Sequence, residues 1–142
     1  MDSSAPAIRS AVRSALESFE AGDLIIVAVS GGADSLALAY ALSLEAPKFA
    51  IQLQAVTIDH QLQAGSGVQA LKVVEQMKSL GIETTIEKVS VEITDGLEAS
   101  ARKARYAALD SIGTTLNAAA IFLGHTRDDQ AESVLLGLAR GS

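Results

Sequence analysis

Residues 24–35 have the sequence Leu-Ile-Ile-Val-Ala-Val-Ser-Gly-Gly-Ala-Asp-Ser, and they decide the fold. The first six residues are apolar and rich in β-branched side chains, which predicts a strand covered on both faces. The two glycines allow a sharp turn, and residues 36–44 that follow have the composition of a helix. The stretch therefore predicts a central strand, a tight loop and a helix.

Strands and helices continue to alternate along the rest of the chain. We expect further strands over about residues 51–58, 83–91 and 118–124, and helices over about residues 6–20, 65–80, 97–117 and 127–140. Strands that alternate with helices of ten or more residues specify a mostly parallel sheet with right-handed crossovers. The predicted fold class is α/β, doubly wound, with helices on both faces of a mostly parallel sheet.

Composition limits what the chain can be. Its 142 residues, 49% of them hydrophobic, are enough to bury the core of one domain. A net charge of −6 provides no general field that attracts RNA, so a nucleic-acid contact requires a local patch or a missing part of the protein. The absence of cysteine excludes disulfides, thiolate metal sites and a catalytic sulfur.

The sequence shows no signal for a membrane or for export. No apolar run approaches the ~20 residues needed to cross a bilayer, and residues 1–22 lack the apolar core of a secretory signal. We therefore expect no membrane contact and a cytoplasmic location. The sequence reaches Arg140-Gly141-Ser142 without a helix-stop signal, which predicts that residues 1–142 are one domain cut from a longer protein.

The loop at residues 30–35 has the features of a phosphate-binding site, although it lacks the Gly-Lys-Ser/Thr of a Walker A motif. Glycines expose backbone N–H groups, and the following helix adds unpaired N–H groups and the positive end of its dipole. Serine hydroxyls at both ends of the loop can donate to the same phosphate oxygens. We expect phosphates to contact Ser30, Gly31, Gly32, Ala33, Asp34 and Ser35.

Asp34 brings a carboxylate into this loop. A carboxylate beside bound phosphates repels them unless a cation lies between, so we assign Asp34 a Mg²⁺-binding role as a hypothesis. The alternative is an ordinary strand-to-helix turn in which Asp34 caps the helix, worth about 1 kcal/mol.

The loop resembles the PP-loop of the N-type ATP pyrophosphatases, which include GMP, NAD and asparagine synthetases and several tRNA-modifying enzymes. Three further segments are similar to the tRNA(Ile)-lysidine synthetases: residues 59–62 (Asp-His-Gln-Leu), 98–106 (Glu-Ala-Ser-Ala-Arg-Lys-Ala-Arg-Tyr) and 124–132 (Gly-His-Thr-Arg-Asp-Asp-Gln-Ala-Glu). Residues 140–142 match the start of that family's Arg-Gly-Ser-Gly stretch. The chain departs from the family at Gln63, where its members usually carry arginine, which puts any phosphate or tRNA contact from that arginine in doubt.

The resemblance implies an ATP-dependent ligase, with this chain as its N-terminal catalytic domain and ATP and Mg²⁺ as cofactors. Lysidine synthetases adenylate the C2 oxygen of the wobble cytidine of an isoleucine tRNA and release pyrophosphate. The ε-amine of free L-lysine then attacks C2, and AMP leaves. The resemblance also implies that the tRNA binds through this domain together with missing C-terminal domains.

In a doubly wound sheet, ligands bind at the carboxyl ends of the strands where the winding reverses. The loops after the first and fourth strands are therefore expected to face each other, with Asp34 opposite residues 125–132. We expect His125 to act in catalysis or phosphate binding, because it follows the fourth strand. Asp129 and Glu132 can share a helix face, where they are expected to hold substrate lysine, and Asp129 is a further candidate for catalysis and Mg²⁺. The alternative for Asp129 is a capping box with Thr126.

Arg102 and Arg105 are three residues apart on the predicted long helix, so they can point at one polyanion. Guanidinium groups suit both a transferring phosphoryl group and a tRNA backbone, and the resemblance favours a catalytic role for both arginines. The alternative is that Arg102 pairs with Glu98 on a solvated helix face.

Three rival functions were weighed against a lysidine synthetase. The tRNA cytidine thiolases share the His-x-x-Asp-Asp pattern but need cysteines, which this chain lacks. Another PP-loop ligase that adenylates a small molecule remains open, and it predicts pyrophosphate release without tRNA. A non-catalytic ATP-binding module also remains open, since fold alone does not fix function.

Overall fold

The computed structural model describes residues 5–61, 65–91, 96–127 and 130–137. Its elements, in chain order, are α1 (Ala5–Leu16), β1 (Leu24–Ala28), α2 (Ala33–Glu45), the short 3₁₀ helix η1 (Ala46–Phe49), β2 (Gln52–Asp59), α3 (Ser66–Ser79), β3 (Glu83–Lys88), α4 (Leu97–Leu116), β4 (Ala120–Arg127) and β5 (Gln130–Gly137). Among the helices in these ranges, none is long and apolar enough to span a bilayer.

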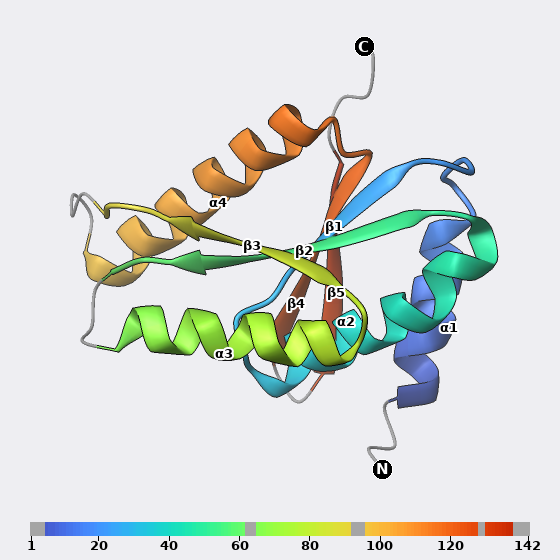
Figure 1. Cartoon of the computed structure of the whole chain (residues 1–142), viewed down its shortest axis with the longest axis horizontal. Coiled ribbons are helices and arrows are strands. Elements are labelled where there is room, and N and C mark those ends of the chain that lie inside the picture. Colours follow the sequence, from blue (N-terminus) through green and yellow to red (C-terminus); the bar gives the residue numbers. More distant parts are fainter. Residues whose placement is uncertain (1–4, 62–64, 92–95, 128–129, 138–142) are drawn as a thin grey trace.

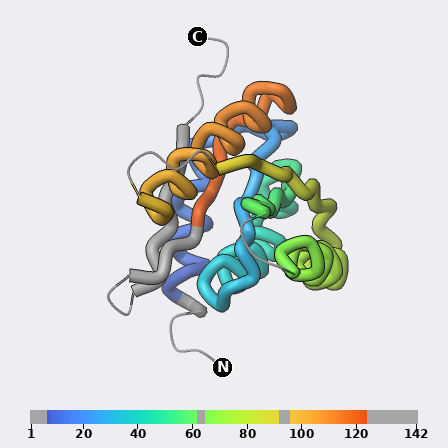
Figure 2. Tube along the Cα trace, turned by 90° about the vertical axis from the view of Figure 1, so that its left-hand side faces the viewer, coloured from blue at the N-terminus to red at the C-terminus, as the bar shows by residue number. Residues whose placement is uncertain are grey.

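The five strands form one sheet in the order β3-β2-β1-β4-β5. β1 pairs in parallel with both β2 and β4, β2 pairs in parallel with β3, and β5 alone runs antiparallel, along β4. Figures 1 and 2 show α1, α2 and α3 on one face of the sheet and α4 on the other. The doubly wound, mostly parallel α/β fold is therefore confirmed.

The central strand β1 contributes to a hydrophobic core on each face of the sheet. Ile25 and Val27 pack with α1, α2 and α3, whereas Ile26 packs with Leu109 of α4 and Ile121 of β4. These residues are at most 1% exposed, and burying each such side chain contributes roughly 1.5–3 kcal/mol. The apolar run at residues 24–29 thus occupies the doubly covered position that its sequence predicts.

One predicted element is wrong. We expected a helix over residues 127–140, but the chain forms a hairpin in which Arg127 pairs with Gln130 and β5 continues to Gly137. Local composition favours the helix, with Ala131, Glu132 and Leu135 all good helix formers. β4, however, presents an edge of backbone N–H and C=O groups, and pairing this edge with β5 satisfies them.

A buried carboxylate joins α1 to the end of α2. Glu45 is fully buried, and its Oε2 accepts hydrogen bonds from Nε and Nη2 of Arg9 at 3.0 and 2.7 Å. Its Oε1 lies 3.3 Å from Nε of Arg13 and 3.5 Å from Nζ of Lys48. The hydrogen bond from Arg9 is the main cause that holds the pKa of Glu45 below its ordinary value, although burial opposes it. We call these four residues the Glu45 cluster.

Candidate functional site

The site lies at the carboxyl ends of β1 and β4, where the winding of the sheet reverses. The two strands are direct neighbours, with Ala28 paired with Leu123 at the last register position of the pairing. Because helices cross to opposite faces on the two sides of this point, the chain leaves a crevice there. The loop at residues 30–35 begins two residues after β1 and faces this crevice.

Gly31 gives the loop its shape. Its φ is +94°, a conformation that favours glycine, and a Cβ there would lie 2.5 Å from Nε2 of Gln69 and 3.3 Å from Cγ2 of Val73. The loop therefore rests directly against α3, without a side chain between.

The two serines of the loop bond to each other and to the backbone. Their Oγ atoms are 3.2 Å apart, and Oγ of Ser35 also accepts from the N–H of Ser30 at 3.2 Å. Oγ of Ser30 accepts from the N–H of Gly32 at 3.3 Å. These contacts hold both hydroxyls at one place, where a phosphate oxygen can replace one serine as the partner of the other.

Asp34 lies half-buried in the first turn of α2 and does not cap it. The N-cap residue is Gly32, and no side-chain hydrogen bond caps the helix. The alternative in which Asp34 serves as the helix cap is therefore wrong. The first turn keeps its N–H groups available to an anion, with one carboxylate beside them.

Arg105 of α4 lines the same cavity as the two serines of the loop. A cavity of about 330 Å³ is lined by the polar residues Ser30, Ser35, His60 and Arg105 together with apolar residues of β1, β2 and β4. Arg102 lines a neighbouring cavity of about 1090 Å³ with Glu98 and Arg105. Arg105 thus shares one cavity with the loop serines, while Arg102 lines only the neighbouring cavity; the catalytic role of both arginines stays a prediction.

Both arginines contact the ring of Tyr106. The guanidinium carbons of Arg102 and Arg105 lie 5.6 and 5.5 Å from its ring centroid, which is the distance of a cation–π contact. In the part of the chain that the structure describes, no ion pair joins Arg102 to Glu98, so the solvated pair that we weighed as an alternative does not form.

His60 lines all three cavities of this region, including one of about 520 Å³ beside α3. His60 belongs to a segment that resembles the lysidine synthetases, but this resemblance alone predicts no role for it. The sequence does contain a feature that could have identified His60 as a site residue. It directly follows β2, the neighbour of β1, and therefore lies at the edge of the sheet where such folds bind ligands. Its Nδ1 is buried without a hydrogen-bond partner, as is Nε of Arg105.

Asp59 fixes the backbone on which His60 stands. It is 4% exposed, and its Oδ1 accepts from the N–H of Gln61 at 2.9 Å, which holds Gln61 at a φ of +57°. Hydrogen bonds from Ser66 and then Gln61 lower the pKa of Asp59. Burial and then Arg105 lower the pKa of His60, against an opposing effect of Asp59. The imidazole is therefore neutral at neutral pH.

For several predicted site residues, the structure describes only the backbone or does not describe the residue. His125 is on β4 directly opposite Glu132 on β5, so Glu132 belongs to a strand and the shared helix face with Asp129 is removed. Their side chains are not described, and Asp129 and Gln63 lie outside the described residues. Within those residues, no three His, Asp or Glu side chains gather as a metal site.

Comparisons with known proteins agree with this geometry. Residues 5–142 match the family model described as a PP-loop domain. The chain is 52% identical to a tRNA(Ile)-lysidine synthase of Thermobifida fusca over 137 residues, which are 95% of this chain and 42% of that relative. It is 54% identical to a tRNA(Ile)-lysidine synthase of Streptomyces coelicolor over 121 residues, which are 84% of this chain and 34% of that relative.

Solved structures share the fold at low sequence identity. A U34-tRNA thiolase of Methanococcus maripaludis with its [4Fe-4S] cluster superposes with a TM-score of 0.74 and 19% identity, over 87% of this chain and 45% of that one. The NH3-dependent NAD synthetase of Campylobacter jejuni gives 0.54 and 17%, over 85% of this chain and 56% of that one. On the match to the family model, the chain belongs to the PP-loop family of ATP-binding domains.

Proposed function

We propose that this chain is the ATP-binding part of a ligase that joins free L-lysine to the wobble cytidine of an isoleucine tRNA. One observation carries the proposal: the loop hydroxyls, His60 and Arg105 come from three different elements and line one cavity of about 330 Å³. Its similarity to two tRNA(Ile)-lysidine synthases supports the choice of substrates. The chain spans 42% or less of these relatives, so a longer protein is part of the proposal.

The proposed reaction has two steps. The C2 oxygen of cytidine attacks the α-phosphorus of ATP, and pyrophosphate leaves. The ε-amine of lysine then attacks C2, a proton is released, and AMP leaves with the oxygen. Ser30, Ser35 and the N–H groups of the loop bind phosphate oxygens, while Arg105 stabilises the charge that develops during transfer. His125, Asp129 and Glu132 remain predicted contacts for phosphate and lysine.

The residues present fit a Mg²⁺ ion. Mg²⁺ in such sites takes one or two carboxylates, completes its shell with water and phosphate oxygens, and neutralises phosphate charge. Asp34 supplies one half-buried carboxylate beside the loop. We therefore expect Asp34→Asn to abolish most Mg²⁺-dependent ATP turnover, and undiminished turnover would remove Asp34 from the metal site.

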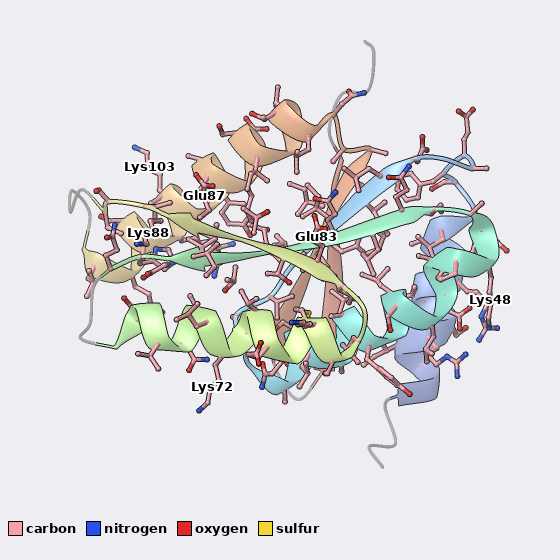
Figure 3. All side chains as sticks on the ribbon, viewed as in Figure 1. Lys48, Lys72, Glu83, Glu87, Lys88 and Lys103 are labelled. Atoms are coloured by element: carbon pink, nitrogen blue, oxygen red, sulfur yellow. The ribbon has the colours of Figure 1, made fainter. Side chains whose placement is uncertain are left out.

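The tRNA is proposed to approach from the side of α4. Figure 3 shows Lys88 and Lys103 toward the end of the molecule where β2 and β3 finish, and Lys48 at the other end. These lysines and Arg102 are basic groups that a tRNA backbone can contact, although Glu87 lies among them and the net charge of the chain is −6. We expect residues 1–142 alone to bind ATP but to bind tRNA poorly, because few basic groups are available.

The decisive experiment uses the natural full-length protein with ATP, Mg²⁺, labelled lysine and isoleucine tRNA. We expect label in the tRNA, with one AMP and one pyrophosphate released for each lysine joined. Pyrophosphate release without tRNA would support a small-molecule ligase instead, and ATP binding without AMP or pyrophosphate would support a non-catalytic module. A cytoplasmic location also stays a prediction, which microscopy of the tagged protein would test.

A further inference from the structure

Among the described residues, the 330 Å³ cavity is lined by hydrogen-bond donors and by no carboxylate. Its described polar side chains are two serine hydroxyls, one guanidinium and one imidazole, supplied by the loop, by α4 and by His60. Donors that converge without a competing acceptor suit an anionic oxygen. Of these four side chains, only His60 has no role in binding or catalysis proposed above.

The surroundings of His60 select one tautomer of its ring. Nδ1 is buried without a partner, and so is Nε of Arg105, which always carries a proton. A proton on Nδ1 would add a second buried N–H without an acceptor, beside a cation, and such a donor is costly. Either tautomer leaves Nδ1 without a partner, but a bare nitrogen lone pair is favoured beside the Arg105 cation, whereas an N–H there is repelled, so the proton belongs on Nε2.

Nε2 is the ring nitrogen that remains open to a ligand. No hydrogen bond within the described residues engages this atom, and it is not among the buried atoms that lack a partner. It is therefore accessible. The carboxylate of Asp59 does not compete for the ring, because it accepts from Gln61 and Ser66. The turn at residues 59–61 therefore holds a neutral ring with an accessible donor, on a residue that lines the cavity shared with the loop serines.

We propose that His60 binds the nucleotide directly, with its Nε2–H donating to an oxygen of the α-phosphate. This inference rests on the proposed ATP site and names a residue that distinguishes the α-phosphate from the rest of the nucleotide. The loop serines line the same cavity, so His60 and the loop hold adjacent parts of one phosphate chain.

Two nearly isosteric variants test the atom that donates. The amide nitrogen of glutamine reaches the position of Nε2, whereas that of asparagine reaches only the position of Nδ1. We expect His60→Gln to bind AMP within about threefold of the unaltered chain and His60→Asn to lose about 10- to 100-fold in affinity, the range for a hydrogen bond to a charged group. Titration calorimetry measures both, and thermal melts confirm that both variants fold.

Adenosine is the matched ligand without a phosphate. Its affinity is expected to be the same for both variants, and equal losses for AMP and adenosine would overturn the inference. Equal AMP affinities for His60→Gln and His60→Asn would overturn it as well. If the unaltered chain binds neither ATP nor AMP, the proposed ATP site itself fails and the inference falls with it.

Nitrogen NMR reads the tautomer without any ligand. The chain has two histidines, so ¹⁵N-histidine labelling gives two ring systems, and His60→Gln identifies the one from His60. We expect Nδ1 to resonate as a bare nitrogen and Nε2 as a protonated one. The opposite assignment would overturn the proposed donor.

Discussion

The Glu45 cluster and the pair formed by His60 and Arg105 both contain buried polar nitrogen or oxygen atoms, but they differ in how these atoms are satisfied. The fully buried Glu45 has three cations within 3.5 Å of its carboxylate oxygens. Oε1 of Glu45, Nδ1 of His60 and Nε of Arg105 all lack a hydrogen-bond partner, but Oε1 faces two cations, whereas the described residues offer no ion pair to His60 or Arg105. The cluster lies between α1, α2 and η1, whereas the pair lies at the crevice beside the loop.

This difference indicates that the Glu45 cluster supports the fold, whereas the pair formed by His60 and Arg105 can bind a ligand. Buried charges that only support a fold need partners, because an unpaired one is destabilising. Unpaired polar atoms in a cavity leave hydrogen-bonding capacity for a ligand and cost stability until it binds. Substitutions in the two regions should therefore affect different measurements.

The largest effect is expected from removing two partners of Glu45. Arg9→Met combined with Arg13→Met leaves a buried carboxylate with Lys48 alone, and we expect most of the chain to be unfolded at 37 °C by circular dichroism. Adding Glu45→Met should restore much of the lost stability, because a well-packed apolar group often replaces a buried ion pair at little cost. A stable double variant, or a triple variant that stays unfolded, would contradict this account of the cluster.

Arg105→Gln should impair catalysis but leave the stability of the fold nearly unchanged. We expect the rate of ATP-dependent pyrophosphate release by the full-length protein to fall about 100- to 1000-fold, the typical result of removing one transition-state donor. The melting temperature should shift by no more than a few degrees, since Nε of Arg105 has no hydrogen-bond partner and the contact with Tyr106 is worth only about 0.5–1 kcal/mol. A large drop in melting temperature would make Arg105 a structural residue.

Acid should weaken the Glu45 cluster in a defined direction. The folded pKa of Glu45 lies below its ordinary value, chiefly because of Arg9. Its contribution to stability is therefore complete above the unfolded pKa and is lost as the pH falls through the folded pKa. Thermal melts at decreasing pH should show this loss in the unaltered chain and a smaller one in the triple methionine variant. Parallel curves for the two proteins would argue against it.

The smallest effect concerns the ring that holds the arginines. Tyr106→Leu removes both cation–π contacts at a cost of about 0.5–1 kcal/mol each, and we expect a loss of less than tenfold in turnover. Tyr106→Phe keeps the ring and should behave like the unaltered protein in denaturant titrations and turnover assays. Equal losses in both variants would shift the role of Tyr106 to its hydroxyl group.

Local sequence was sufficient for the elements that build the crevice. The apolar run at residues 24–29, the glycine pair and the helix after it reveal β1, the loop and α2, and helical composition places Arg105 on α4. The general rule for where doubly wound sheets bind ligands placed the loop at the carboxyl end of β1, but it did not predict that Arg105 lines the same cavity. These features depend on short-range patterns and on one topological rule.

Other features depend on contacts that no short window contains. Glu45 receives its hydrogen bonds from Arg9, 36 residues earlier, so the cluster is not visible in local patterns. The strand β5 was missed because its own residues favour a helix, and only the edge of β4 shows why a strand forms. The orphaned Nδ1 of His60 requires knowledge of what packs around the ring. His125, Asp129 and Glu132 remain predictions.

The close seating of Gly31 on α3 also has a practical use. Without a side chain between them, Cγ2 of Val73, in the hydrophobic core, supports the loop directly. We expect a change in loop conformation on ligand binding to alter the environment of this face of α3. Leu71, two residues away and 60% exposed, can carry a fluorescent label on this helix. Such a label would turn the loop into an optical sensor, so that ligands of the crevice could be screened without tRNA.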